Sequence, residues 1–197
     1  MTIMRTARIA IALAATAALS GCISFGKDPP ESLLSLTPTT EVAPGTAING
    51  DVADAIEVVE PDTPARLDVV RVPVQIDDTN IAYLKDAQWV EKPARLFRRL
   101  LGETIRAKGN RLVIDGDDPA LTPKMQLRGT LSQFGYDART SSAVVRFDAI
   151  RDVNGRAVMT KRFESVVSGV PAEAGPVGEA LNRAANDVAG QVADWVG

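Results

Sequence analysis

The sequence predicts a single domain with an α/β fold, because strand patterns and two amphipathic helices share the chain after residue 55. The three longest strands are expected at residues 124–136, 141–152 and 156–167. Shorter strands are expected at residues 55–59, 69–76, 80–84 and 111–115. The helices are expected at residues 93–108 and 173–196. Pro73 indicates that the strand at 69–76 lies at a sheet edge or contains a bulge.

The middle long strand has the clearest β pattern, with one apolar and one mixed face. Its apolar face consists of Ala143, Val145, Phe147 and Ala149. The following Asn154-Gly155 pair is typical of a two-residue type I′ hairpin. Such a turn pairs Val153 with Arg156. Asp148 then faces Lys161 across the two strands.

Each helix has an apolar face, and Pro93 and Gly109 suit the start and stop of the first helix. Its apolar residues are Leu96, Phe97, Leu100, Leu101 and Ile105. Its arginines, mostly on the other face, are Arg95, Arg98, Arg99 and Arg106. The second helix carries a stripe that we expect to be buried against the sheet: Val177, Leu181, Ala184, Val188, Val192 and Trp195.

Residues 1–21 have the features of a lipoprotein signal peptide. Arg5 and Arg8 precede an apolar run of 11 residues at 9–19, which is too short to span a bilayer. Leu19-Ser20-Gly21-Cys22 resembles the bacterial lipobox, whose cysteine thiol takes a diacylglycerol and becomes the mature N-terminus. We therefore predict lipid attachment at Cys22. An ordinary signal peptide with an accidental cysteine is the alternative.

An acidic tether is expected after the anchor, at residues 22–54. The stretch 23–65 holds six of the 12 prolines and eight acidic residues against one lysine, a net charge of −7, whereas residues 66–197 carry +2. Such a composition favours a mostly flexible chain. Its apolar part at 32–37 is expected to join the sheet as a short strand, with a loose loop up to residue 54. The domain then occupies 55–197.

Composition argues against several classes of function. The 197-residue chain has a net charge of −3 and a pI near 5.1, which gives no cationic field for nucleic acid. It has no His, the commonest general base and metal ligand. Its one Cys excludes an internal disulfide framework and a CxxC pair. The acidic residues at 115–118 lack the spacing of a calcium loop and indicate a solvated turn. We expect no enzyme activity, cofactor or metal.

Several short motifs occur in an order that resembles one known family. They are Leu33-Leu34-Ser35-Leu36-Thr37-Pro38, Arg71-Val72-Pro73-Val74, Ile81-Ala82-Tyr83, Ala87-Gln88-Trp89, the Leu-rich helix after Pro93, Leu131-Ser132-Gln133-Phe134, Arg162-Phe163-Glu164 and Ala180-Leu181-Asn182-Arg183-Ala184-Ala185-Asn186. The chain resembles the ABC-type transport auxiliary lipoproteins, which include the outer-membrane component of paraquat-inducible intermembrane transport. Leu34 stands where that family commonly has an aromatic residue.

The resemblance implies an α/β sandwich with a mixed, largely antiparallel sheet packed by two main helices. It implies a non-enzymatic accessory lipoprotein that works with a mammalian-cell-entry (MCE) domain substrate-binding protein and an ABC permease and ATPase to move lipids or hydrophobic molecules. The chain is expected to face the periplasm, and Ile23 after Cys22 favours the outer over the inner membrane. A ring of identical subunits is compatible with this role. A lipid-anchored regulator of envelope assembly is the alternative.

Four residues are candidates for contact with a partner: Trp89, Arg95, Arg99 and Arg106. Trp89 precedes the first helix and either packs in the core or contacts a partner. The arginines either meet anionic headgroups or an acidic partner, or form a solvated helix face.

Overall fold

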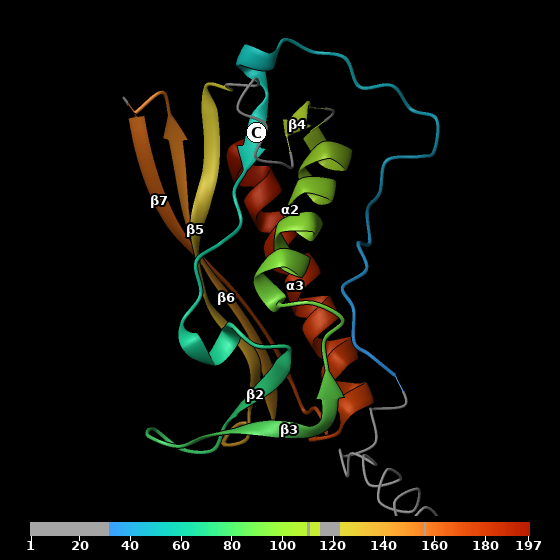
Figure 1. Ribbon diagram of the computed structural model, residues 1–197, viewed down its shortest axis with the longest axis vertical. Helices are drawn as coiled ribbons and strands as arrows, with labels where there is room; N and C mark the ends of the chain where they lie inside the picture. The colour runs from blue at the N-terminus through green and yellow to red at the C-terminus, as the bar shows by residue number, and fades with distance from the viewer. Residues whose placement is uncertain (1–31, 110, 115–122, 156) are drawn as a thin grey trace, which may run out of the picture.

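The fold is a seven-stranded open sheet with two helices on one face (Figure 1). The structure is a computed structural model, and it describes residues 32–109, 111–114, 123–155 and 157–197. The strands are β1 (Ile56–Val58), β2 (Arg71–Gln75), β3 (Ile81–Gln88), β4 (Val113–Ile114), β5 (Met125–Asp137), β6 (Ser142–Val153) and β7 (Ala157–Ser168). The helices are α2 (Pro93–Gly109) and α3 (Ala174–Val196), with short 3₁₀ turns η1 (Val52–Asp54) and η2 (Ala65–Leu67).

The sheet is mixed and largely antiparallel, as the family resemblance implies. Strand β5 pairs antiparallel with β6 along its length, and β6 pairs antiparallel with β7. The other side of β5 pairs parallel with β1 near its start and with β2 near its end. Strand β3 adds antiparallel to β2, and β4 adds parallel to β1. Pro73 lies at a bulge of β2 rather than on an edge strand, because β2 has β3 on one side and β5 on the other.

The core lies between the sheet and the two helices. The predicted apolar face of β6 is buried, and Phe147 meets Phe97 of α2 edge to face at 5.4 Å. The predicted apolar residues of α2 and α3 are buried as well, with one exception. Trp195, expected in the core, is only half-buried, because it lies in the last turn of α3 and packs edge to face on Phe163 at 5.5 Å.

The β6–β7 hairpin corrects the predicted register. Val153 pairs with Ala157 rather than Arg156, so Asp148 faces Arg162 and not Lys161. The Asn154-Gly155 pair does adopt the positive φ angles of 55° and 64° that suit such a turn. The pairing of Val153 with Ala157 leaves three residues between the strands, one more than the predicted two-residue turn. Gly155 N donates to the Asp152 carboxylate, and Asn154 N donates to Lys124 O.

The expected strand at residues 32–37 is reduced to one parallel bridge between Leu34 and Trp89. The neighbouring backbone polar groups bond to side chains of α3 instead of to a strand, which explains why no longer ladder forms. The other predicted strands form close to their expected bounds, although β3 extends four residues farther than the predicted segment. The signal peptide, Cys22 and the acidic turn at 115–118 lie outside the described residues.

Candidate interaction surface

Trp89 is a core residue by its position. Its side chain is 1% exposed, and its ring meets Phe134 of β5 edge to face at 5.3 Å. Its backbone N–H donates to Val70 O at 2.7 Å, which fixes the chain between β3 and α2. The structure therefore supports the packing alternative for Trp89, with no side-chain surface left for a partner.

The arginines of α2 form ion pairs with acidic residues on the same surface. Arg95 lies 3.8 Å from Glu91 and 3.7 Å from Glu60, and Arg99 lies 2.5 Å from Glu91. The hydrogen bond from Arg99 lowers the pKa of Glu91 and raises the pKa of Arg99 itself. Arg106 pairs with Glu103 at 2.6 Å. The outward face of α2 is thus a row of ion pairs, which favours a solvated face over a patch of positive charge.

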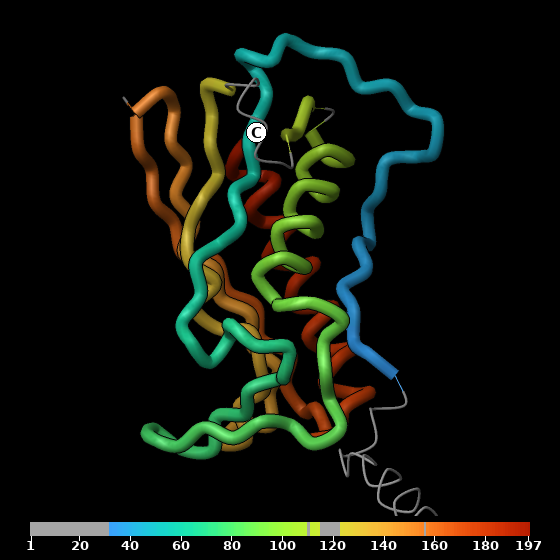
Figure 2. The backbone as a smooth tube through the Cα atoms, in the orientation of Figure 1, coloured from blue at the N-terminus to red at the C-terminus, as the bar shows by residue number. Residues whose placement is uncertain are grey.

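Residues 33–42, which we call the strap, run along α2 and α3 (Figure 2). In Figure 1 the strap is the blue segment that rises beside the two helices before the chain turns over the top of the molecule. Its start is fixed to the end of β3: Leu34 N donates to Gln88 O at 2.7 Å, and Val90 N donates to Leu34 O at 2.9 Å. The first part of the expected flexible tether is therefore attached to the domain.

Two asparagines of α3 hold the middle of the strap. Thr37 N donates to Asn182 Oδ1 at 2.9 Å, and Thr39 N donates to Asn186 Oδ1 at 2.8 Å. Asn186 Nδ2 also donates to Thr37 O at 2.9 Å. Asn182 and Asn186 are four residues apart, so they lie on the same face of α3. Their amides satisfy backbone groups much as a neighbouring strand does.

The remaining contacts of the strap are apolar and acidic. Leu34 and Leu36 are half-buried against the core. Leu34 fits over Gly178 of α3, where an added Cβ atom lies only 2.5 Å from Leu34 Cδ2. Val42 N donates to Glu103 Oε1 of α2 at 2.8 Å, so Glu103 joins the strap to Arg106.

A groove lies between the strap and α2. Its lining residues are Leu36, Pro38, Leu96, Arg99, Leu100, Glu103 and Arg106. The structure thus brings Arg99 and Arg106 to one groove and leaves Arg95 and the buried Trp89 outside it. The sequence analysis assigned no role to Gly178, Asn182 or Asn186. The signal available there was the pair of asparagines at helical spacing, since asparagine is a poor helix former that bonds well to backbone.

The described residues show neither a metal centre nor a membrane-spanning helix. No group of three or more acidic, cysteine or histidine side chains within them is placed to hold a metal ion. Neither α2 nor α3 is both long and apolar enough to cross a bilayer. The contacts of the strap are suited to holding the leading segment of the chain against the domain.

Comparison with known proteins identifies the fold and the family. A protein described as uncharacterized has a crystal structure with a TM-score of 0.65 and 11% identity, covering 84% of this chain and 100% of that chain. A DUF330 protein from Xanthomonas campestris gives a TM-score of 0.66 and 14% identity, covering 84% and 94%. The PelC dodecamer from Paraburkholderia phytofirmans reaches only 0.37, at 15% identity over 74% and 93%, which is too low to indicate a shared fold.

No curated protein matches the sequence. A family model, by contrast, matches residues 33–193, from the first residue of the strap to the last turn of α3. The chain belongs to the family of ABC-type transport auxiliary lipoprotein components.

Proposed function

We propose that this chain is a non-catalytic, lipid-anchored accessory component of an MCE-type ABC transporter that moves lipids or other hydrophobic molecules across the cell envelope. Its membership of the transport auxiliary family over residues 33–193 carries the proposal. The chain works at the periplasmic side of a membrane, with the outer membrane as its site. Its partners are an MCE-domain protein and the permease and ATPase of the transporter.

The packing of the domain supports a role in docking rather than as a lipid carrier. Phe97 of α2 packs edge to face on both Phe134 and Phe147 of the sheet. Apolar side chains of both layers are thereby used to fill the core. An acyl chain needs a comparable apolar space of its own. We infer that the domain caps or extends the channel of its partner, as one subunit or as a ring of identical subunits.

Replacing Cys22 with serine tests the anchor. The mature chain is expected to lose membrane attachment, because serine cannot form the thioether that carries the acyl chains. Cells fed labelled palmitate are expected to label the parent chain and not the Cys22→Ser variant, and fractionation should find the variant released or incompletely processed. Label entering the variant contradicts attachment at Cys22.

Affinity capture of the tagged full-length chain from native membranes tests the partner. An MCE-domain protein with its permease and ATPase should be enriched over a capture from cells that express the untagged chain. The Cys22→Ser variant serves as the mislocalised control and should recover less of the transporter. Reproducible recovery of an envelope synthase or secretion pore, without an MCE-domain protein, rejects the transporter assignment and supports a regulator of envelope assembly.

A further inference from the structure

The docking of the strap shortens the connection between the lipid anchor and the domain. Eleven residues separate Cys22 from Leu34, the first residue of the strap with a backbone bond to the domain. Fully extended, the connection reaches about 40 Å, and a flexible chain of this length spans about 20 Å on average. A tether that remained free up to Ala55 could reach about 110 Å. The domain is thus held close to the membrane surface.

The strap also determines which end of the domain is nearest to the anchor. Leu34 lies beside the end of β3 and the first turns of α3, where it contacts Gly178. Helix α3 has 23 residues and is therefore about 35 Å long. Its other end lies near the β6–β7 hairpin, since Arg151 Nη1 donates to Trp195 O at 3.2 Å. In Figure 1 that hairpin is at the top of the molecule and β3 crosses the bottom.

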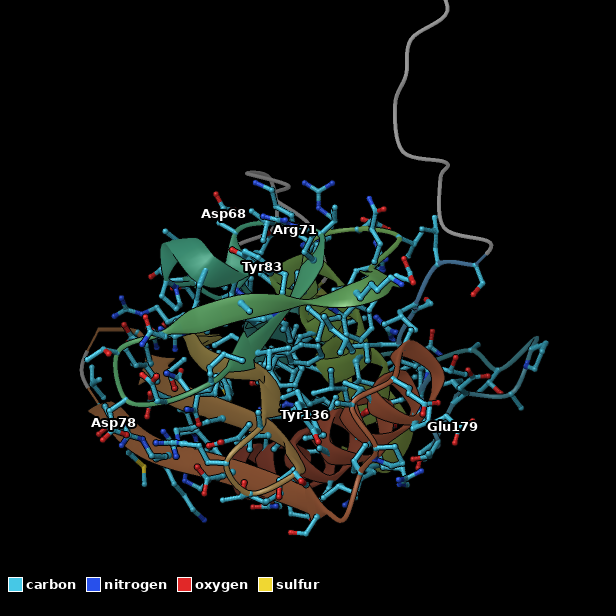
Figure 3. The ribbon with its side chains drawn as sticks, turned by 90° about the horizontal axis from the view of Figure 1, so that it is seen from below. Asp68, Arg71, Asp78, Tyr83, Tyr136 and Glu179 are labelled. Carbon is cyan, nitrogen blue, oxygen red and sulfur yellow. The ribbon has the colours of Figure 1, made fainter. Side chains whose placement is uncertain are left out.

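The end nearest to the anchor exposes apolar side chains along a free strand edge. Among the described strands β3 pairs only with β2, and the strap bonds to its last residue, Gln88, through Leu34 N. Figure 3 shows β3 crossing this end of the molecule, beside the Tyr83 label. Four large apolar side chains in β3 or close to its ends are each at least 43% exposed: Leu33, Ile76, Ile81 and Val90. Exposed apolar residues suit an interface with lipid or protein. Strand β7 exposes Val158, Met159 and Val166 to a similar extent, so the short connection to the anchor, and not apolar exposure alone, singles out the β3 end.

We propose that the strap orients the domain with its β3 end against the lipid surface that holds the anchor, and directs the β6–β7 hairpin away from that surface. This inference rests on the proposed lipid attachment at Cys22. It assigns the occupant of the β3 end, the bilayer itself, from the short connection that begins there. A transporter that docks on this chain must then approach the sides or the hairpin end of the domain.

The ion pairs at the β3 end indicate that attraction to anionic lipid does not set this orientation. Lys85 lies 3.7 Å from Asp86, and Lys92 lies 2.7 Å from Asp68. The guanidinium of Arg71 lies over the ring of Tyr83, 3.8 Å from its centre. Cations already paired with acidic residues give little net attraction to a negative surface. The orientation is therefore expected to be the same on zwitterionic and on anionic vesicles.

Energy transfer from two labelled positions to lipid tests the orientation. Full-length lipidated chain carrying Val90→Cys or Val158→Cys is labelled with a donor dye and reconstituted into vesicles that contain rhodamine-headgroup lipid. Both parent side chains are exposed, at 48% and 54%, and Cys22 is the chain's one native cysteine. Transfer should be stronger from position 90 than from 158, in phosphatidylethanolamine vesicles with or without phosphatidylglycerol. Equal transfer, or stronger transfer from 158, overturns the proposal.

A variant that releases the strap provides a second test in the same energy-transfer experiment. Gly178→Ala places a methyl group against Leu34, whereas Gly175→Ala, in the same helix, meets nothing within 4 Å and is the matched control. The difference between the two labels should shrink in Gly178→Ala and persist in Gly175→Ala. A full difference in a folded Gly178→Ala overturns the role of the strap. If Gly178→Ala does not fold, the comparison of energy transfer from positions 90 and 158 in the chain with Gly178 still tests the orientation.

Flotation of the vesicles separates this inference from the proposed function. Protein that fails to float with the vesicles contradicts the lipid anchor, and the proposed orientation fails with it. Protein that floats but shows no difference between the two labels leaves the anchor in place and overturns only the orientation.

Discussion

Asp77 stabilises the turn between β2 and β3 through its carboxylate. The side chain of Asn80 and the backbone N–H groups of Thr79 and Asn80 donate to it, and these bonds lower the pKa of Asp77 from 3.8 to about 2. Because folding lowers this pKa, the stabilisation is complete above the unfolded value and is lost as the pH falls through about 2. A carboxyl-carbon NMR titration should find Asp77 still ionised at about pH 3.

The Asp77→Asn variant assigns the signal, because it removes one titrating carboxyl and leaves the neighbouring acids unchanged. A midpoint near the ordinary value for Asp contradicts the turn geometry.

For single residues, burial and ion pairing decide between the alternatives that the sequence left open for Trp89 and for the arginines of α2. The sequence predicted that Trp89 either packs or contacts a partner, and only its position between β3 and α2, against Phe134, selects packing. The arginine face of α2 was visible from its spacing, but Glu60, which lies near Arg95, comes from a distant part of the chain. Side-chain pairing between remote segments cannot be read from local periodicity.

At the scale of single elements, α3 is the main support of the sheet. Leu181 is completely buried, so Leu181→Ala should lower the free energy of unfolding by about 2–5 kcal/mol through lost contacts and the cavity that remains. Arg183→Ala, two residues away on the exposed face, should change it by less than about 0.5 kcal/mol. Urea unfolding of both variants measures the difference. A loss below about 1 kcal/mol for Leu181→Ala contradicts the described core.

Asn186→Ala, unlike Leu181→Ala, is expected to weaken the attachment of the strap and not the global stability of the domain. Loss of the bonds to Thr37 and Thr39 should weaken the strap locally by about 1 kcal/mol, or roughly fivefold faster amide exchange at Thr39. Global stability should hold, because alanine is the better helix former. Hydrogen exchange with Arg183→Ala as the control distinguishes local release from general destabilisation. Unchanged protection at Thr39 contradicts the strap.

The elements themselves were largely predictable, whereas their connections were less so. Alternation and helical spacing located β5, β6, α2 and α3, because each buries one continuous apolar face. Strand β7 was also located, although Phe163 is its one buried residue. The hairpin register differs from the predicted one by one residue, since Val153 pairs with Ala157 and the connection is three residues long rather than the two that the dipeptide pattern predicts. The sequence predicted that residues 32–37 join the sheet as a strand, but it did not predict that the strap docks on α3, because the asparagines that bind it lie more than 140 residues away.

For the whole molecule, the order of weak motifs predicted more than any single pattern. The parallel pairing of β1 and β2 with opposite ends of β5 joins segments far apart in sequence, so local periodicity could not predict it. The family resemblance implied only that the sheet is mixed and largely antiparallel. The family likewise supplied the functional expectation, since the chain offers no His and one Cys for chemistry.

The proposed role of the chain in transport between membranes is tested most directly by one rate. That is the rate at which newly synthesised, isotopically labelled phospholipid moves between the inner and the outer membrane. Cells without the chain should show altered movement relative to the parent, and the full-length chain should restore it. Cys22→Ser, expressed at the same level, should restore it poorly because the domain is no longer held at the membrane. Identical rates in the parent and the deletion strain, with the transporter genes intact, contradict a role in phospholipid transport.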